Sequence, residues 1–206
     1  MGQYTTIVID FETTGLSPGD GDRTIEVGAV LVSNCQIVDR FQSLMNPGMR
    51  ISGFIEEYTG ITNRMLSKAP TIKDVMNKLK VFLAHHHLVA HNASFDSRFL
   101  DAELGRINHK RKNEFVCSML TSRRLYPDAP NHQLETLVRY KNLKTDGVHH
   151  RALADAEMTA HLWLRMLEDI RSDYGLQAVP FGLMQQLSRI SKKKVPEFMQ
   201  KMKLKE

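Results

Sequence analysis

The residues of this chain most able to do chemistry are carboxylates and a histidine in three separate stretches. Asp10 and Glu12 stand two positions apart at the end of an apolar, β-branched run. Side chains two apart on a strand point to the same face, so both carboxylates are expected on one face and Phe11 on the other. Such a pair repels unless one acid is protonated or a cation lies between them. Because hard divalent cations take oxygen ligands, the pair predicts a metal site; two solvated acids at a strand end are the alternative.

The other two stretches each place an acid where a helix is expected to begin. Asp96 ends the sequence His-Asn-Ala-Ser-Phe-Asp at positions 91–96, which follows a short apolar strand. Asp155 lies near the start of a long helix, five positions after His150. Only this five-residue step separates His150 from the adjacent His149 as a candidate. Taken singly, each motif is typical of a helix-entry acid that the helix dipole stabilises.

Together the three stretches predict a shared site. Strand ends and helix starts converge on one edge of an α/β sheet, where ligand sites form. Converging carboxylates need cations to be stable, and two divalent ions about 3.5–4 Å apart are the arrangement of two-metal phosphodiesterases. A histidine with a pKa of about 6.5 can take the proton from an attacking water. The sequence therefore predicts phosphodiester hydrolysis at this edge.

The elements that position these residues follow from the hydrophobic pattern. We expect three consecutive strands, then alternating helices and strands, then a long helix, which is an α/β layout with a mixed sheet. Thr71 is expected to cap the first of the longer helices. The expected strands cover residues 4–10, 24–32, 36–45, 88–90 and 115–117, and the expected helices cover 72–83, 95–104, 133–140 and the stretch from 152 onward.

Composition excludes several classes of protein. Hydrophobic residues make up 42% and charged residues 25% of the 206 residues, which is typical of a globular chain. Two cysteines are too few for a disulfide framework, and no apolar run approaches the roughly 20 residues that span a bilayer. We therefore expect a cytoplasmic protein without membrane contact, and we expect Cys35 and Cys117 to be buried free thiols.

The net charge of +5 lies at the C-terminus. Residues 171–206 contain eight Lys or Arg and three acids, whereas the first 170 residues are balanced. A basic segment can bind a polyanion by neutralising phosphates, and a solvated, solubilising terminus is the alternative. The helical periodicity of the apolar residues weakens from residue 172 onward. The chain is therefore expected to form one domain over residues 1–172, followed by a basic tail over 173–206.

With the three motifs in this order, the sequence resembles the DEDDh exonucleases. It is most similar to the proofreading exonuclease subunit of bacterial DNA polymerase III and its stand-alone relatives. The resemblance rests on residues 9–16, 91–96 and 150–156 and covers about residues 4–170. It implies an RNase H-like fold and 3′→5′ release of nucleoside monophosphates from single-stranded or frayed DNA ends, with RNA also possible.

The resemblance also implies a role for each site residue. Two Mg²⁺ or Mn²⁺ ions would be held by Asp10, Glu12, Asp96 and Asp155, and His150 would be the general base. Leu16 would act as an apolar wedge against bases, and Phe95 would stack on a base. The full set of nucleotide contacts would be Thr13, Thr14, Gly15, Leu16, Thr59, His91, Asn92 and Phe95. Thr59 departs from the His that relatives often carry before this glycine, which leaves the specificity of that loop open.

Several partners and functions stay open. The resemblance suggests a DNA polymerase or a sliding clamp as a partner, and residues 186–190 are weakly similar to clamp-binding peptides. The alternatives are a non-catalytic nucleic-acid-binding or polymerase-associated module, and an oligoribonuclease-type RNA exonuclease. All five residues implied for catalysis are present, which favours an enzyme. The order of the motifs argues against a ribonuclease H-type endonuclease.

Overall fold

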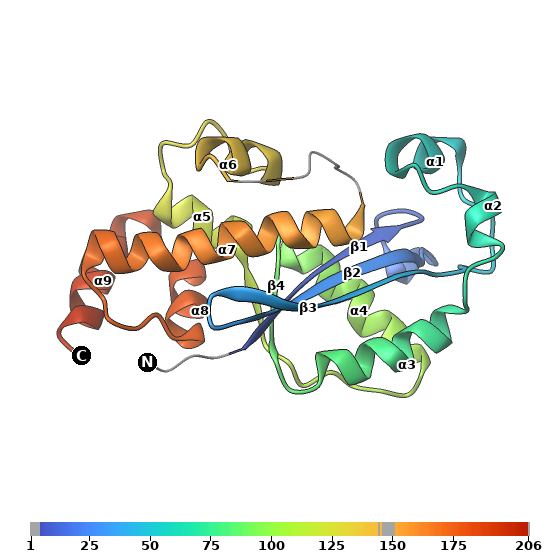
Figure 1. The fold of residues 1–206 in the computed structure, drawn as a ribbon, viewed down its shortest axis with the longest axis horizontal. Coiled ribbons are helices and arrows are strands. Elements are labelled where there is room, and N and C mark those ends of the chain that lie inside the picture. The colour runs from blue at the N-terminus through green and yellow to red at the C-terminus, as the bar shows by residue number, and fades with distance from the viewer. Residues whose placement is uncertain (1–4, 144, 146–150, 206) are drawn as a thin grey trace.

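The centre of the molecule is a five-stranded mixed sheet (Figure 1). The structure is a computed structural model that describes residues 5–143, 145 and 151–205. Its strands are β1 (Thr6–Thr13), β2 (Thr24–Ser33), β3 (Gln36–Leu44), β4 (His87–Ala90) and β5 (Phe115–Cys117). They lie in the order β3-β2-β1-β4-β5. β1, β2 and β3 pair antiparallel, whereas β4 runs parallel to both β1 and β5. The expected mixed sheet of three consecutive and two later strands is confirmed.

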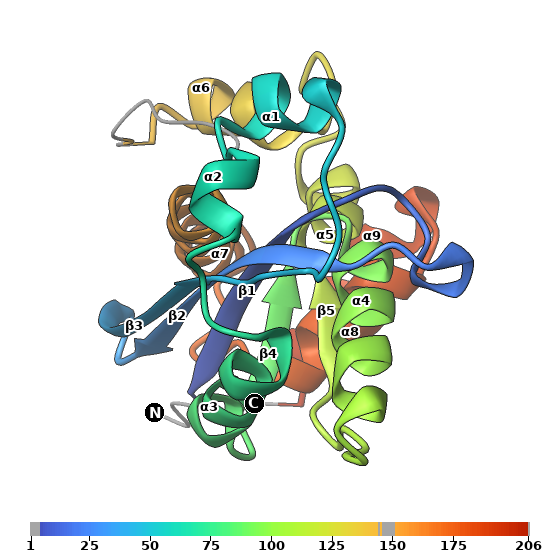
Figure 2. The ribbon, with the colours of Figure 1, turned by 90° about the vertical axis from the view of Figure 1, so that its right-hand side faces the viewer.

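Helices cover both faces of the sheet (Figure 2). The long helix α7 (Ala152–Tyr174) packs on one face, and α3 (Ile72–Leu83) and α4 (Ala93–Arg106) pack on the other. The remaining helices are α1 (Gly53–Thr59), α2 (Asn63–Leu66), α5 (Ser118–Leu125), α6 (Leu134–Tyr140), α8 (Phe181–Arg189) and α9 (Val195–Lys203). The α/β class is therefore confirmed. Across the described residues, none of these helices combines the length and apolar character needed to cross a membrane.

The alternating pattern of β1 separates two hydrophobic cores. Ile7, Ile9 and Phe11 belong to the core shared with α3 and α4. Val8 points the other way and belongs to the core shared with α7. Asp10 and Glu12 continue the Val8 side of the strand, because alternate residues share a face. One strand thus supplies apolar anchors along its length and acids where it ends.

Helix α3 begins where its cap was expected. The Thr71 hydroxyl accepts a hydrogen bond from the backbone N–H of Asp74 at 3.1 Å. This satisfies one of the backbone donors that a helix start leaves unpaired, which is worth about 1 kcal/mol. The helix then buries one apolar stripe against the sheet.

The C-terminal segment contributes to the core of the sheet. Phe181, Leu187 and Met199 are buried in the same core as Trp163 of α7. Helix α7 itself continues to Tyr174, so the boundary expected at residue 172 falls inside a helix. The weak periodicity arises because the apolar residues of 173–206 are divided between two short helices, α8 and α9.

The same packing affects residues 186–190, which are weakly similar to a clamp-binding peptide. Most of this stretch lies within α8, and Leu187 is fully buried. It is therefore part of the folded core and is not an exposed peptide. The lysines of the segment remain at the surface, and Lys192–Lys194 form an exposed 3₁₀ turn.

The β2–β3 turn corrects one expectation. Asn34 and Cys35 both have positive φ values, of 52° and 59°, which is the backbone of a tight two-residue hairpin turn. Cys35 is consequently exposed, so the expectation of a buried thiol is wrong there. Cys117 is partly buried at the end of β5.

Candidate active site

Three acids from two elements meet where β1 ends. Asp10 and Glu12 lie on β1, and Asp155 lies in the first turn of α7. One ligand oxygen from each of the three falls within 4.8 Å of the others. Carboxylate oxygens grouped in this way suit a hard divalent cation. The structure therefore brings together the acids of the first and third sequence stretches.

Asp96 reaches the same cleft from the start of α4. The helix follows Asn92, whose φ of 67° and ψ of 46° lie in the left-handed region that asparagine tolerates. Asp96 is only 2% exposed, and its Oδ1 has no hydrogen-bond partner among the residues described. Because an unpaired buried carboxylate oxygen is costly, this atom fits a cation as its partner.

The pKa values of these acids reflect burial and mutual repulsion. Burial, followed by the charges of Asp155 and Glu26, raises the pKa of Glu12 to about 8. Burial also raises the pKa of Asp96 to about 8, against the opposite effect of backbone hydrogen bonds. The pKa of Asp10 lies well above its usual range, first through burial and then through the charges of Asp96 and Asp155. A bound cation would favour the ionised form of all these groups, so the donor set fits a metal.

The expected general base lies outside the described residues. His150, like its neighbour His149, falls in the range 146–150. The description resumes at Arg151, the residue that precedes α7. The role of His150 therefore stays a prediction.

A cleft of about 710 Å³ opens around the acids. Its lining includes every nucleotide contact implied by the resemblance, namely Thr13, Thr14, Gly15, Leu16, Thr59, His91, Asn92 and Phe95. Leu16 is 77% exposed there. A large apolar side chain so exposed beside polar groups is typical of a binding surface.

Two of these lining residues use their polar atoms within the protein. The Thr59 hydroxyl donates to the Ile55 carbonyl at 2.7 Å and accepts from the Ile61 N–H at 3.1 Å. The ring of His91 contacts the Ser118 hydroxyl and the His132 carbonyl, each at 2.9 Å. Burial lowers the pKa of His91 to about 4, so this histidine is neutral at pH 7. Both residues therefore shape the cleft wall.

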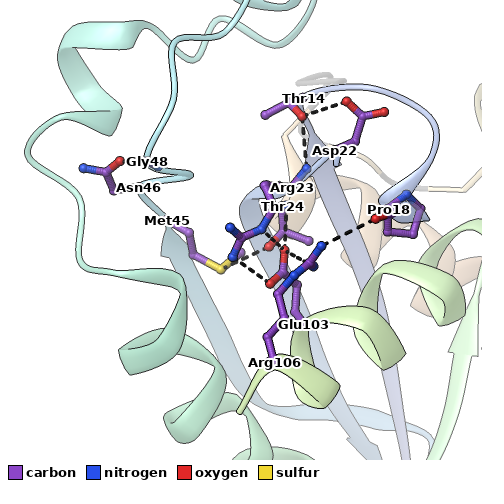
Figure 3. Close-up of polar contacts among 10 residues, drawn as sticks. All are labelled: Thr14, Pro18, Asp22, Arg23, Thr24, Met45, Asn46, Gly48, Glu103 and Arg106. Atoms are coloured by element: carbon purple, nitrogen blue, oxygen red, sulfur yellow. Dashed lines mark hydrogen bonds and ion pairs between the residues drawn. The ribbon is translucent and has the colours of Figure 1, made fainter. Parts of the chain in front are cut away.

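Hydrogen bonds within the loop after β1 hold Thr14 to Asp22 and Arg23 (Figure 3), and Leu16 lies in this loop. The Thr14 hydroxyl donates to Asp22 Oδ1 at 3.1 Å and accepts from the Arg23 N–H at 3.0 Å. Asp22 Oδ2 accepts from the Ser17 N–H at 2.9 Å. A Cβ on Gly15 would lie 2.4 Å from both carboxylate oxygens of Asp22, so the loop closes this tightly because position 15 has no side chain.

Sequence reasoning missed an aromatic wall of the cleft. Phe54 and Tyr58 of α1 stack with ring centroids 5.9 Å apart and planes 13° apart, and they are 71% and 51% exposed. Burial and the charges of Glu12, Asp155 and Asp10 raise the pKa of Tyr58, which places the phenol within the field of the acids. Two aromatic residues four apart, on one face of a helix, are the signal that could have identified this wall.

Taken together, the sheet topology and the acid cluster define an RNase H-like fold whose acidic cleft suits divalent cations. The sequence profile of the RNase_T family, described as Exonuclease, matches residues 7–163. The chain belongs to this exonuclease family.

Curated relatives place the chain beside two kinds of bacterial protein. The DNA polymerase III PolC-type of Bacillus subtilis strain 168 is 41% identical over 179 residues, which is 86% of this chain and 12% of that protein. The 3′-5′ exonuclease DinG of the same strain is 34% identical over 192 residues, which is 93% of this chain and 20% of that protein. The chain thus corresponds to a small part of the length of these relatives.

Solved structures share the fold. Exonuclease X in complex with 5′ overhanging duplex DNA is 28% identical, with a TM-score of 0.69, and the match covers 89% of this chain and 99% of that one. The nuclease domain of 3′hExo, a DEDDh family member bound to rAMP, is 24% identical. Its TM-score is 0.70, over 82% of this chain and 94% of that one, and it supports the fold alone.

Proposed function

We propose that this chain removes nucleoside 5′-monophosphates from single-stranded or frayed 3′ ends of DNA. The observation that carries the proposal is the convergence of Asp10, Glu12 and Asp155 beside the buried, unpaired oxygen of Asp96. Membership of the exonuclease family, and a relative named as a 3′-5′ exonuclease, support the same direction of attack.

The four acids would hold two Mg²⁺ or Mn²⁺ ions. Bound there, divalent ions polarise the scissile phosphate and stabilise the leaving oxygen. The shared negative charge of Asp10, Glu12 and Asp155 supports this assignment, because a buried acid cluster is stable in its ionised form only beside cations.

The remaining residues would bind and orient the strand. His150 would take the proton of the attacking water, a role suited to an imidazole near neutral pH. Leu16 would wedge against the last bases, and the faces of Phe95, Phe54 and Tyr58 would stack on them. Stacking of this kind is worth about 1–3 kcal/mol per base and accepts any sequence. The exposure of Leu16, Phe54 and Tyr58 within one cleft supports this division of labour.

The cellular setting belongs to the same proposal. The PolC-type relatives suggest association with a DNA polymerase. Cys35 and Cys117 are free thiols, which suits a reducing cytoplasm.

A time course with end-labelled oligonucleotides tests the proposal. Single-stranded DNA and RNA, labelled at either the 5′ or the 3′ end, are incubated with the protein and Mg²⁺, Mn²⁺ or EDTA. We expect a shortening ladder from the 5′-labelled strand, immediate release of mononucleotide from the 3′-labelled strand, and no reaction in EDTA. Release of nucleotides from the 5′ end, internal fragments, or full activity in EDTA would overturn it. Faster degradation of RNA than of DNA would reassign the substrate.

A further inference from the structure

Strand β2 carries a further buried acid, Glu26, beside the acid cluster. Glu26 stands directly opposite Glu12 in the antiparallel β1–β2 register, and its side chain is fully buried. Its charge helps to raise the pKa of both Asp10 and Glu12. An acid that adds repulsion to a metal site needs another role to offset that cost.

Four donors occupy the Glu26 carboxylate. Arg151 binds it with two parallel bonds, Nη2 to Oε1 at 2.7 Å and Nε to Oε2 at 3.1 Å. Oε2 also accepts from the Ala152 N–H at 3.1 Å, and Oε1 accepts from Gln42 Nε2 at 3.0 Å. With both oxygens engaged in this way, Glu26 is a poor candidate for a further metal ligand.

The Ala152 N–H is the first backbone donor of α7, and a helix start leaves such donors unpaired. Arg151, at the N-cap position, makes no side-chain capping bond. The carboxylate of Glu26 therefore caps α7 from a neighbouring strand, with the negative charge that a helix N-terminus favours. Arg151 also directly follows His150, the expected general base, in the chain.

Gly28, two residues further along β2 on the same face, lets the helix start touch the strand. A Cβ at this position would lie 2.1 Å from Ala152 C and Leu153 N. Gly28 stands opposite Asp10 in the register, just as Glu26 stands opposite Glu12. The two β2 residues that hold the start of α7 are thus the cross-strand neighbours of the two β1 acids.

We propose that Glu26 is a positioning residue that fixes Asp155 relative to Asp10 and Glu12 by holding Arg151 and Ala152. The inference rests on the proposed function of the acid cluster. Asp155 lies in the first turn of α7, three residues after Ala152, whose N–H is capped. Any shift of the helix start therefore moves the Asp155 carboxylate. Partners that orient metal ligands typically change metal affinity or activity by about 10–100-fold when they are lost.

The variant Glu26→Gln tests this role, because it keeps the side-chain shape but removes the charge that binds Arg151. We expect Mn²⁺ affinity, measured by calorimetry on the nuclease, to fall about 10–100-fold. We expect kcat to fall by a similar factor, with KM for the oligonucleotide changed less than about threefold, because the base-binding wall is intact. Mn²⁺ affinity and kcat both within twofold of the wild-type values would overturn the proposal.

Glu103→Gln is the matched control. Glu103 is also fully buried, and it binds Arg23 through two parallel bonds of 2.8 and 3.0 Å and Arg106 at 3.2 Å (Figure 3). Its carboxylate caps no helix next to the acids. We expect this variant to lose stability while keeping Mn²⁺ affinity within about threefold of wild type. Equal loss of affinity in both variants would reduce Glu26 to a general stabiliser and would also overturn the proposal.

Arg151→Lys decides the matter should Glu26→Gln not fold. Lysine keeps the charge but cannot form the two parallel bonds, so a smaller loss of Mn²⁺ affinity is expected. Unchanged affinity and kcat in a folded Arg151→Lys protein would overturn the proposal. Because Mn²⁺ binding is measured without substrate, a wild-type protein that binds Mn²⁺ but hydrolyses no 3′ end would contradict the proposed function and leave the positioning role testable.

Discussion

Asp10 is the residue on which the electrostatics of the site converge. Its pKa is raised by burial and by the charges of Asp96, Asp155, Glu12 and Glu26. In the metal-free protein this carboxyl is therefore a source of instability, and with bound cations it becomes a ligand. Under the proposed function, the same side chain would oppose folding without metal and support catalysis with it, which is expected where a site is built from like charges.

Asp10→Asn is expected to abolish detectable nuclease activity while raising the stability of the metal-free protein. Replacing the carboxylate by an amide removes both a ligand and a repulsive charge, and each kcal/mol gained raises Tm by about 2–4 °C in a chain of this size. Thermal unfolding in EDTA and the oligonucleotide assay measure the two effects. The exposed Asp20→Asn serves as control and should change neither. Activity close to wild type in Asp10→Asn would remove this residue from the site.

Phe54→Ala tests the aromatic wall at the same scale. Loss of one stacking face should raise KM for single-stranded DNA about tenfold, from about 1.4 kcal/mol of lost stacking, and leave kcat within about threefold. Val81→Ala is the control, because Val81 is 75% exposed and lies on α3, away from the cleft lining. Equal KM values for Phe54→Ala and wild type would show that bases do not stack there.

Site residues could be predicted from the sequence where the pattern that reveals them involves only neighbouring residues. Asp10 and Glu12 were expected on one face because strand alternation needs only neighbouring residues. Glu26 was missed because its main partner, Arg151, lies 125 residues further along the chain. Phe54 was missed because the short helix that carries it was not predicted.

At the scale of elements, the packing of helix α7 against strand β2 determines whether Asp155 lies next to Asp10 and Glu12. The strand β2 and the helix α3 were predicted close to their observed bounds, and the start of α7 was predicted at Ala152. The helices α1, α2 and α5 have only 7, 4 and 8 residues, too few for a clear helical period, and they were missed. The close approach of α7 to β2 was not anticipated, although a glycine inside a strand often marks such an approach.

Gly28→Ala is the element-scale prediction. Its Cβ would lie 2.1 Å from the backbone of Ala152, so the start of α7 has to move away from β2. Overpacking of this kind costs about 1–3 kcal/mol or more, and we expect a large loss of Mn²⁺ affinity along with a lower Tm. Gly105→Ala in α4 is the control: nothing lies within 4 Å of its Cβ, so it should raise stability by up to about 1 kcal/mol. Wild-type Mn²⁺ affinity in Gly28→Ala would contradict this account of α7.

At the scale of the whole molecule, charge and site lie at opposite ends. The acids gather where α1 overhangs the sheet, whereas α9, which carries Lys201 and Lys203, lies at the far end (Figure 1). The excess of positive charge in residues 171–206 was predicted from the sequence, but the packing of this segment into the core was not. Its apolar residues are divided between two short helices and therefore give little periodicity. Phe181 and Met199 nevertheless anchor these helices in the core beside α7.

The acid cluster predicts how stability depends on pH. Glu12 and Asp96 have a pKa of about 8 in the folded protein, against usual values of 4.5 and 3.8. At pH values between the usual pKa values of these acids and about 8, the folded protein holds protons that the unfolded chain has released. The metal-free protein should therefore lose stability as the pH rises from 6 to 8. Mg²⁺ should therefore raise Tm more at pH 8 than at pH 6. A Mg²⁺ effect that is equal at both values, or larger at pH 6, would contradict the coupling.

The most direct test of the account is the binding of Mn²⁺ itself, measured by calorimetry on the wild-type protein and on Asp155→Asn. If acids from β1, α4 and α7 form one centre, the wild type binds Mn²⁺ with a stoichiometry of about two. Loss of the single α7 carboxylate should then abolish at least one site and weaken the other by about tenfold or more. Identical isotherms for the two proteins, or no binding by the wild type, would contradict the claim that the three stretches meet to hold divalent ions.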